Sequence, residues 1–139
     1  MRGNKNNPYH FSVGAVVIKD GNIALLKKPD DSITLPRETL YSKESIENNL
    51  ARGLEEELGV IVKVKKYLGS IQEYFYRPDK TRVEKTTAYF LVIATKNTKR
   101  NPQKDEMDDE IMWLSPSDAL KLLKSSNNKE YKIVQRAKP

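Results

Sequence analysis

The sequence contains no cysteine and only one histidine, His10. Disulfide bonds and thiolate chemistry are therefore excluded. A lone histidine at the start of a predicted strand is usually structural, so we assign no function to it. No apolar run approaches the roughly 18 residues of a membrane-spanning helix, and the N-terminus lacks the apolar segment of a secretory signal. Because these signals are missing, we expect a cytoplasmic protein that does not interact with membranes.

The composition indicates a basic chain that is long enough for one domain. Its 139 residues include 25 lysine and arginine residues against 19 acidic ones, which gives a formal net charge of +6. We expect a disordered tail over residues 1–8 and a single domain over residues 9–139. The positive charge suits a polyphosphate ligand, although ordinary surface lysine explains it at least as well. No arginine-rich stripe or RNA-binding signature is present, which argues against nucleic acid as a partner.

Apolar and β-branched runs alternate with turn signals along the chain. Asp20-Gly21 predicts a hairpin turn, and Ser115-Pro116 with Asp118 predicts the start of a helix. No internal repeat is visible. This order of elements predicts an α/β fold with a mixed sheet between helices. The predicted strands cover residues 11–18, 22–28, 33–35, 60–67, 71–76, 86–94 and 111–114, and the predicted helices cover about 43–58 and 115–124, with one more turn in the tail.

The helix predicted over residues 43–58 is unusual in its acids. Ser42 or Ser45 can cap its start, and Gly59 suits its end. Glu57 falls at the edge of the apolar stripe, where a carboxylate is costly unless a cation or a donor compensates it. The alternative is a solvated acidic face in which Arg52 pairs with a glutamate four residues away. The stripe itself consists of Ile46, Leu50, Leu54 and Leu58.

Residues 38–60 resemble the Nudix box, Gly-x5-Glu-x7-Arg-Glu-U-x-Glu-Glu-x-Gly-U, in which U is aliphatic. Further segments resemble the MutT-like and diadenosine-polyphosphate-hydrolase-like branch of that superfamily, so the likeness covers about residues 9–124. They include Leu35-Pro36, residues 73–76 and 82–92, and the closing strand and helix from residue 109. Positions in register with the box are Glu44, Arg52, Leu54, Glu56, Glu57, Gly59 and Val60.

This resemblance implies a Nudix-type α/β/α sandwich and divalent-metal-dependent hydrolysis of a nucleoside diphosphate linked to another moiety. Mg²⁺ or Mn²⁺ is the implied cofactor, and a nucleotide-type small molecule is the implied substrate. The resemblance also allows a homodimer, since many members of the family dimerise. The implied metal ligands are Glu56, Glu57, Glu38 and Glu106, and the implied catalytic residues are Glu57, Glu106, Arg52 and Glu38, with Glu44 in a supporting role.

Two groups of residues outside the helix complete the expected site. Glu106, seven residues before Trp113, is the expected third carboxylate, with Asp105, Asp108 and Glu110 as competitors. Candidates for substrate contacts are Arg37, Arg82 and Lys85 for phosphate, and Tyr76, Tyr74 and Tyr89 for stacking on a base, although strand aromatics usually pack in the core.

The chain departs from the box at two positions. Glu38 replaces the first glycine, and Gly53 replaces the glutamate after the arginine. We hypothesise that the Glu38 side chain reaches into the volume left at position 53 and restores the negative charge, which requires its carboxylate to lie within about 8 Å of Glu56 and Glu57. The alternative is neutral drift. Gly53 would then favour a Nudix-fold module that binds a nucleotide without turnover, and a basic nucleic-acid-binding protein ranks last.

Overall fold

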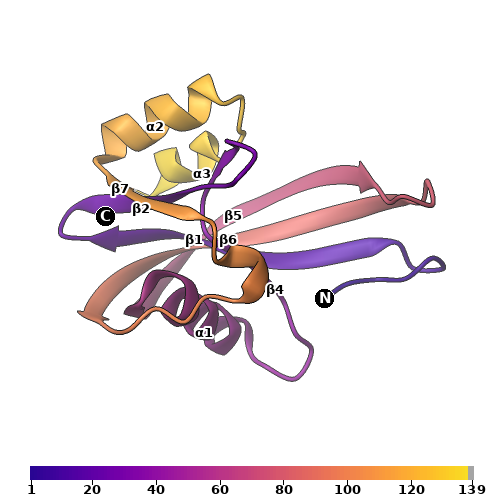
Figure 1. Cartoon of the computed structure of the whole chain (residues 1–139), viewed down its shortest axis with the longest axis horizontal. Coiled ribbons are helices and arrows are strands. Elements are labelled where there is room, and N and C mark those ends of the chain that lie inside the picture. The colour runs from indigo at the N-terminus through magenta and orange to yellow at the C-terminus, as the bar shows by residue number, and fades with distance from the viewer. Residues whose placement is uncertain (138–139) are drawn as a thin grey trace.

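The computed structural model describes residues 1–137, in which a mixed sheet separates one helix from two others (Figure 1). This arrangement is the predicted α/β/α sandwich. The strands are β1 (Tyr9–Lys19), β2 (Asn22–Lys27), β3 (Ile33–Thr34), β4 (Arg37–Thr39), β5 (Val60–Tyr76), β6 (Arg82–Asn97) and β7 (Glu110–Leu114), and the helical segments are α1 (Ile46–Leu58), the 3₁₀ turn η1 (Lys104–Glu106), α2 (Pro116–Ser125) and α3 (Tyr131–Arg136).

The strands β1 and β2 separate beyond the turn that joins them, so the sheet divides between them. The two strands pair only beside their turn, at Ile18 and Lys19. Asp20 and Gly21 both have positive φ, which is the two-residue hairpin turn predicted for them. Beyond the turn, β2 pairs with β3 and β1 pairs with β4, so the short β3–β4 segment fills the division. On its other side β1 runs parallel to β6, which pairs with β5.

Alternation along the strands gives the sheet two apolar faces. On β1, Val13, Ala15 and Val17 face α1, whereas Val16 faces α2 and α3. The helices bury one stripe each against these faces, so a core lies on both sides of the sheet. The α1 side includes Leu50, Leu54 and Leu58, and the opposite side includes Ala119, Leu123, Ile133 and Val134.

Local capping sets the limits of α1. The Ser45 Oγ accepts a hydrogen bond from the Asn48 N–H at 3.1 Å, so Ser45 is the cap and Ser42 is not. Gly59 ends the helix in the left-handed conformation, with φ of 68°. The prediction that Ile46 belongs to the buried stripe is wrong, because its residue is 40% exposed and the core beneath the helix begins at Leu50.

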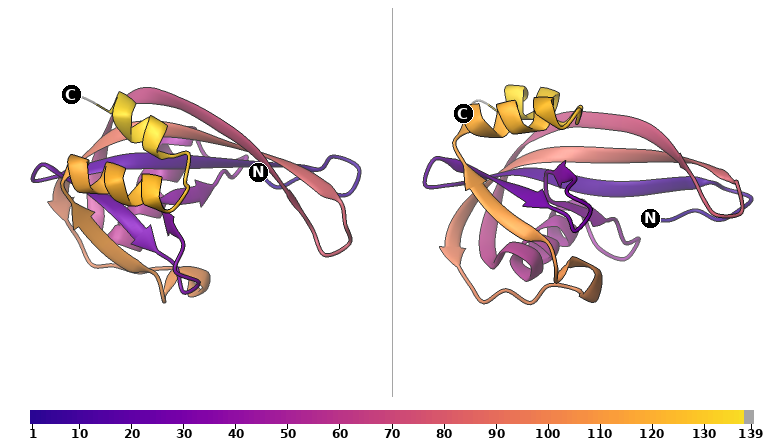
Figure 2. Two further views of the ribbon diagram at one scale, coloured as in Figure 1. Left: turned by 90° about the horizontal axis from the view of Figure 1, so that it is seen from above. Right: turned by 45° about the horizontal axis from the view of Figure 1, so that its top comes forward.

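Two strand predictions need correction. Residues 60–67 and 71–76 form one strand, β5, which continues through irregular pairing around Gly69 instead of ending there. β4 was not predicted, because three consecutive polar residues carry no strand pattern. β5 and β6 extend as a hairpin well beyond the helices, with β1 beside them (Figure 2).

The two ends of the predicted domain complete the description. Residues before β1 fold back along that strand, where Arg2 bridges to His10 and the Met1 carbonyl accepts from the Phe11 N–H. The predicted disorder of residues 1–8 concerns their motion and stays a prediction. Residues 138 and 139 of the predicted domain lie outside the described residues. Within residues 1–137, no helix combines the length and the apolar character needed to cross a membrane.

Candidate metal centre and phosphate pocket

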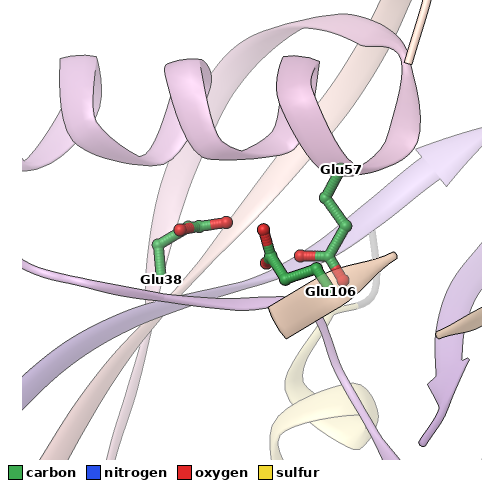
Figure 3. A group of neighbouring side chains, drawn as sticks. All are labelled: Glu38, Glu57 and Glu106. Atoms are coloured by element: carbon green, nitrogen blue, oxygen red, sulfur yellow. The ribbon is translucent and has the colours of Figure 1, made fainter. Parts of the chain in front are cut away.

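Three glutamates from separate parts of the chain meet under α1 (Figure 3). Glu38 comes from β4, Glu57 from α1 and Glu106 from η1. Each offers one carboxylate oxygen, and these oxygens lie within 4.8 Å of one another. All three residues are buried, and Glu57 is only 1% exposed. The acids therefore converge inside the protein and do not form a solvated helix face.

Glu57 shows most clearly that this group of acids lacks a compensating partner. Its Oε1 is buried and has no hydrogen-bond partner among the described residues. Burial, followed by contact with Glu106, raises the pKa of Glu57 above its ordinary value. Burial and the nearby charge of Glu106 raise the pKa of Glu38 in the same direction. Without a further partner, the protein must keep some of these carboxyls protonated.

The donor set fits a hard divalent cation. Carboxylate oxygens are the ligands that Mg²⁺ and Mn²⁺ prefer, and a cation would compensate the unpaired Glu57 oxygen. Ligands on opposite sides of Mg²⁺ lie about 4.2 Å apart, twice its Mg–O distance of about 2.1 Å. The ligand oxygens of Glu38, Glu57 and Glu106 lie within 4.8 Å of one another, so these side chains must move closer together to bind one such ion.

The space beside Gly53 is occupied by Glu38. A Cβ atom built on Gly53 would lie 2.6 Å from the Glu38 Oε1 and closer still to its Cγ and Cδ. The geometric part of the compensation hypothesis therefore agrees with the structure: Glu38 reaches the volume at position 53, beside Glu57. Metal binding by Glu38 stays a prediction.

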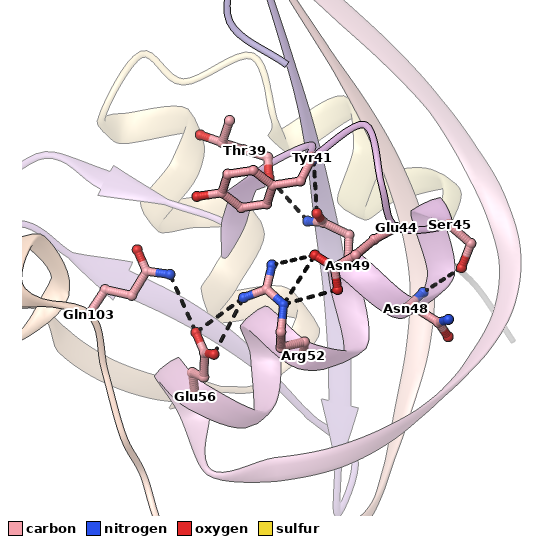
Figure 4. Close-up of polar contacts among 9 residues, drawn as sticks. All are labelled: Thr39, Tyr41, Glu44, Ser45, Asn48, Asn49, Arg52, Glu56 and Gln103. Carbon is pink, nitrogen blue, oxygen red and sulfur yellow. Dashed lines mark hydrogen bonds and ion pairs between the residues drawn. The ribbon is translucent and has the colours of Figure 1, made fainter.

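Glu56 belongs to a different network (Figure 4). Arg52 donates to both carboxylate oxygens of Glu44, at 2.9 to 3.2 Å, and pairs with Glu56 at 3.3 Å. Gln103 donates to the same Glu56 side chain at 3.4 Å. Hydrogen bonding to Glu44 is the main cause that raises the pKa of Arg52. The structure thus does not bring Glu56, a predicted ligand, into the group of three carboxylates.

Asn49 holds the loop between β4 and α1, and the sequence analysis missed it. This side chain is fully buried. Its amide donates to the Thr39 carbonyl at 3.1 Å, and its Oδ1 accepts from the Tyr41 N–H at 3.0 Å. Asn49, Gly53 and Glu57 recur every fourth residue beside the apolar stripe, so they share one buried column of α1. The four-residue spacing of these residues could have predicted a second buried face of the helix, beside the apolar stripe.

The acidic loop before β7 contributes Glu106 alone among the predicted candidates whose side chains are described. Asp108 and Glu110 are exposed, whereas Glu106 is buried. The side chain of Asp105 lies outside the part of the chain that the structure describes. Asp109, which the sequence analysis did not single out, is buried and pairs with Lys28 at 2.6 Å.

A cavity of about 500 Å³ is lined by Arg37 and Lys85, together with Glu73 and Glu130, but by none of the three glutamates of the group. A second hollow of about 240 Å³ shares these two residues and reaches Glu38 and Lys28. Arg37 and Lys85 therefore line both hollows, and the smaller one also includes an acid of the group. Anionic phosphate groups suit these hollows, because Arg37 and Lys85 can each donate to phosphate oxygens.

Glu130, which carried no signal in the sequence, lies at the wall of this cavity. It is 2% exposed and accepts from the Leu35 N–H at 2.8 Å and from the Tyr89 hydroxyl. Its carboxylate also lies 3.9 Å from the Arg37 Nε. Tyr89 is therefore a core residue held by Glu130, which argues against the predicted stacking of Tyr89 on a base.

The remaining substrate candidates lie at the far end of the β5–β6 hairpin. Arg82 and Tyr76 face each other across the two strands. The Arg82 guanidinium lies 4.2 Å from the centre of the Tyr74 ring and pairs with Glu84 at 3.2 Å. Tyr74 lines the larger cavity, whereas neither Arg82 nor Tyr76 lines either hollow. Substrate contacts by Arg82 and Tyr76 stay predictions.

The chain belongs to the Nudix family, because the family model described as "NUDIX domain" matches residues 8–137. The fold is similar to that of a NUDIX hydrolase from Nitrosomonas europaea, with a TM-score of 0.67, 15% identity, and coverage of 91% of this chain and 84% of the other. A MutT NUDIX hydrolase from Burkholderia pseudomallei has a TM-score of 0.62 at 21% identity, covering 78% of this chain and 84% of the other.

The solution structure of the E. coli ORF135 protein gives a TM-score of 0.58 at 21% identity, over 86% of this chain and 83% of that one. No curated protein sequence matches this chain significantly. Membership of the family supports hydrolysis of nucleoside diphosphate derivatives in general terms. It also supports the use of a divalent metal, which Nudix hydrolases generally require.

Proposed function

We propose that this protein hydrolyses a phosphoric anhydride bond in a nucleoside diphosphate derivative, with a divalent cation, Mg²⁺ or Mn²⁺, held by Glu38, Glu57 and Glu106. The observation that carries this proposal is the convergence of three buried carboxylates from three elements, one of which has an oxygen without a partner among the described residues. A structural role alone does not explain why the protein maintains this costly arrangement.

The reaction replaces an anhydride P–O bond by a bond from phosphorus to a water oxygen. The bound cation would neutralise phosphate oxygens and orient the water. Arg37 and Lys85 would hold the phosphates on the side of the larger cavity. Glu106 offers one carboxylate oxygen to the cation, and we assign the water proton to its other oxygen. The leaving phosphate takes the electron pair of the broken P–O bond, so it gains one negative charge.

Arg52 has a positioning role in this proposal. Its guanidinium ties Glu44, before α1, to Glu56 within α1. This contact fixes the start of the helix relative to the turn that carries Glu57. It also compensates Glu56, which we therefore do not count among the ligands of the cation. The prediction that Glu56 is a ligand would hold if a bound cation broke the ion pair between Glu56 and Arg52.

A nucleotide-binding module without turnover is the second candidate. Gly53 favours it, because the acid that follows the arginine in the Nudix box is missing from α1. The two candidates differ in their products. Tight binding of a nucleotide without release of phosphate or nucleoside monophosphate would support the binding module.

The deciding experiment is a panel of nucleoside triphosphates, dinucleoside polyphosphates and nucleotide sugars, assayed for product release with Mg²⁺, with Mn²⁺ and with EDTA. We expect metal-dependent turnover of at least one compound. Glu57→Gln should lower kcat/KM by at least about 100-fold, as a lost charge-stabilising group does. Glu55→Gln is the matched control, since Glu55 is exposed on the same helix. Equal rates for the two variants would contradict the assignment.

Three broader features belong to the same proposal. We expect the protein to act on small nucleotides in the cytoplasm and not on nucleic acid or at membranes. A homodimer stays a prediction, and light scattering at micromolar concentration decides it. Strongly salt-dependent RNA binding without metal would instead support the lowest-ranked alternative.

A further inference from the structure

The relation between Glu38 and Gly53 suggests more than a tolerated substitution. Glu38 lies on β4 and Gly53 lies in the middle of α1, so the two residues belong to different elements. Glu38 nevertheless fills the position that a side chain at residue 53 would need. A glycine inside a helix costs roughly 1 kcal/mol relative to alanine, so its presence calls for a compensating gain.

We infer that one acid of the metal site of this protein comes from β4 instead of α1. Glu38 is then a ligand of the cation, and Gly53 leaves the space that the Glu38 side chain occupies. This inference rests on the proposed function, because it assigns residues of the same cation site. Glu38 and Gly53 then form one functional unit, and neither can change alone without loss.

The contacts of Glu38 support this exchange. Its residue is 8% exposed, and its carboxylate belongs to the group with Glu57 and Glu106. The three nearest atoms that a Cβ at position 53 would meet all belong to the Glu38 side chain. The space above Gly53 is thus taken up by this one carboxylate and its last methylene group.

The backbone around Glu38 explains how a strand residue reaches a helix. β4 pairs with β1 through Val13 opposite Glu38, which fixes the strand in the division of the sheet under α1. Asn49 binds the Thr39 carbonyl directly after Glu38 and comes from the same helix face as Gly53. Glu38 therefore projects from an anchored backbone toward an open place on α1.

Gly53→Ala is the most direct test. The added methyl group must displace the Glu38 side chain, although the substitution removes no carboxylate from the protein. We expect Mn²⁺ binding, measured by titration calorimetry and by the electron paramagnetic resonance signal of free Mn²⁺, to weaken by about tenfold or more, the range seen when the support of a metal ligand is lost. Glu38→Gln should weaken it at least as much. Glu55→Gln should leave it unchanged.

The exchange variant Glu38→Gly/Gly53→Glu tests the relocation itself. It restores the acid to the helix and removes it from the strand, so it should bind Mn²⁺ more tightly than either Glu38→Gly or Gly53→Ala. Gly53→Glu alone should not exceed the wild type, since two carboxylates would then compete for one space. Circular dichroism spectra compare the folding of the variants. If the variants at Gly53 or Glu38→Gly unfold, Glu38→Gln still tests whether Glu38 binds the cation, because glutamine keeps the shape of the side chain.

The outcomes separate this inference from the proposed function. If the wild type binds Mn²⁺ and Glu57→Gln does not, the cation site stands. Unchanged affinity in both Gly53→Ala and Glu38→Gln would then overturn the relocation alone. If the wild type binds no Mn²⁺ even at millimolar concentration, both the site and the relocation fail.

Discussion

Burial and nearby positive charge together decide the protonation of His10. Its Nε2 lies 3.0 Å from the Ser12 Oγ, and the residue is half-buried beside several cationic groups. Burial lowers the pKa of His10 to about 4, with further contributions from Lys85, the N-terminal amine, Arg2 and Arg77. The folded protein therefore resists protonation of this side chain.

This shift predicts a pH dependence of stability. In the unfolded chain a histidine titrates near 6.5, so below that pH the unfolded state binds a proton that the folded state refuses. The contribution of His10 is absent above pH 7, and it lowers the free energy of unfolding as the pH falls from about 6.5 toward 4. We expect a loss of about 1 kcal/mol by pH 5, after allowance for screening by solvent.

The measurement is urea unfolding of the wild type and His10→Gln at pH 7.5, 6, 5 and 4.5. Because His10 is the only histidine, the difference between the two proteins isolates this one group. As the pH falls, the free energy of unfolding of His10→Gln should decrease less than that of the wild type. Parallel curves over the whole range would show that His10 titrates alike in both states.

Elements in this fold are joined by buried polar side chains as well as by apolar contact, and Asn49 joins α1 to β4. Its two hydrogen bonds reach the backbone on both sides of residue 40. Asn49→Ala would leave a carbonyl and an N–H without these partners, at a cost of about 1–3 kcal/mol. Asn48→Ala is the control, because Asn48 is exposed and contributes only its backbone N–H to the cap.

We expect Asn49→Ala to lower the midpoint of urea unfolding, while Asn48→Ala leaves the free energy of unfolding within about 0.5 kcal/mol of the wild type. Loss of the Asn49 hydrogen bonds should also weaken Mn²⁺ binding, since they anchor the segment around Leu40 and Glu38 lies two residues before Leu40. A variant that loses stability but binds Mn²⁺ normally would restrict Asn49 to a structural role.

The elements that could be predicted from the sequence are those with strong local signals. Asp20-Gly21, the Ser115 cap with Pro116, and the Gly59 stop each have a local physical cause, and each appears where it was expected. β4 was missed because its position depends on pairing with β1, which no local pattern encodes. The undivided course of β5 depends in the same way on its long partner β6.

The candidate site was predictable in part for the same reason. Glu57 stood out as an acid at the edge of an apolar stripe, and its burial follows from helix geometry. The box spacing alone grouped Glu56 with it, whereas the structure pairs Glu56 with Arg52. Glu130 gave no signal, because its burial results from contacts with residues more than 40 positions away, such as Tyr89 and Leu35.

At the scale of the whole molecule, the buried acids link metal binding to stability. A ligand that binds only the folded state at 100 times its Kd adds about 2.7 kcal/mol to the free energy of unfolding. For a chain of this length that corresponds to a rise in Tm of about 8–10 °C. We expect this rise on adding Mg²⁺ or Mn²⁺ to metal-free protein, at an ionic strength kept constant with KCl.

Glu57→Gln should act with opposite signs on the two forms of the protein. Without metal the neutral amide removes a buried acid that lacks a compensating partner at Oε1, so the variant should melt at or above the Tm of the wild type. With metal it should lose most of the rise, because the ligand is gone. Scanning calorimetry with EDTA and with Mn²⁺ measures both effects, and Glu55→Gln should follow the wild type in each. A full metal-dependent rise in Glu57→Gln would place the cation elsewhere and would leave the burial of these three glutamates without its explanation.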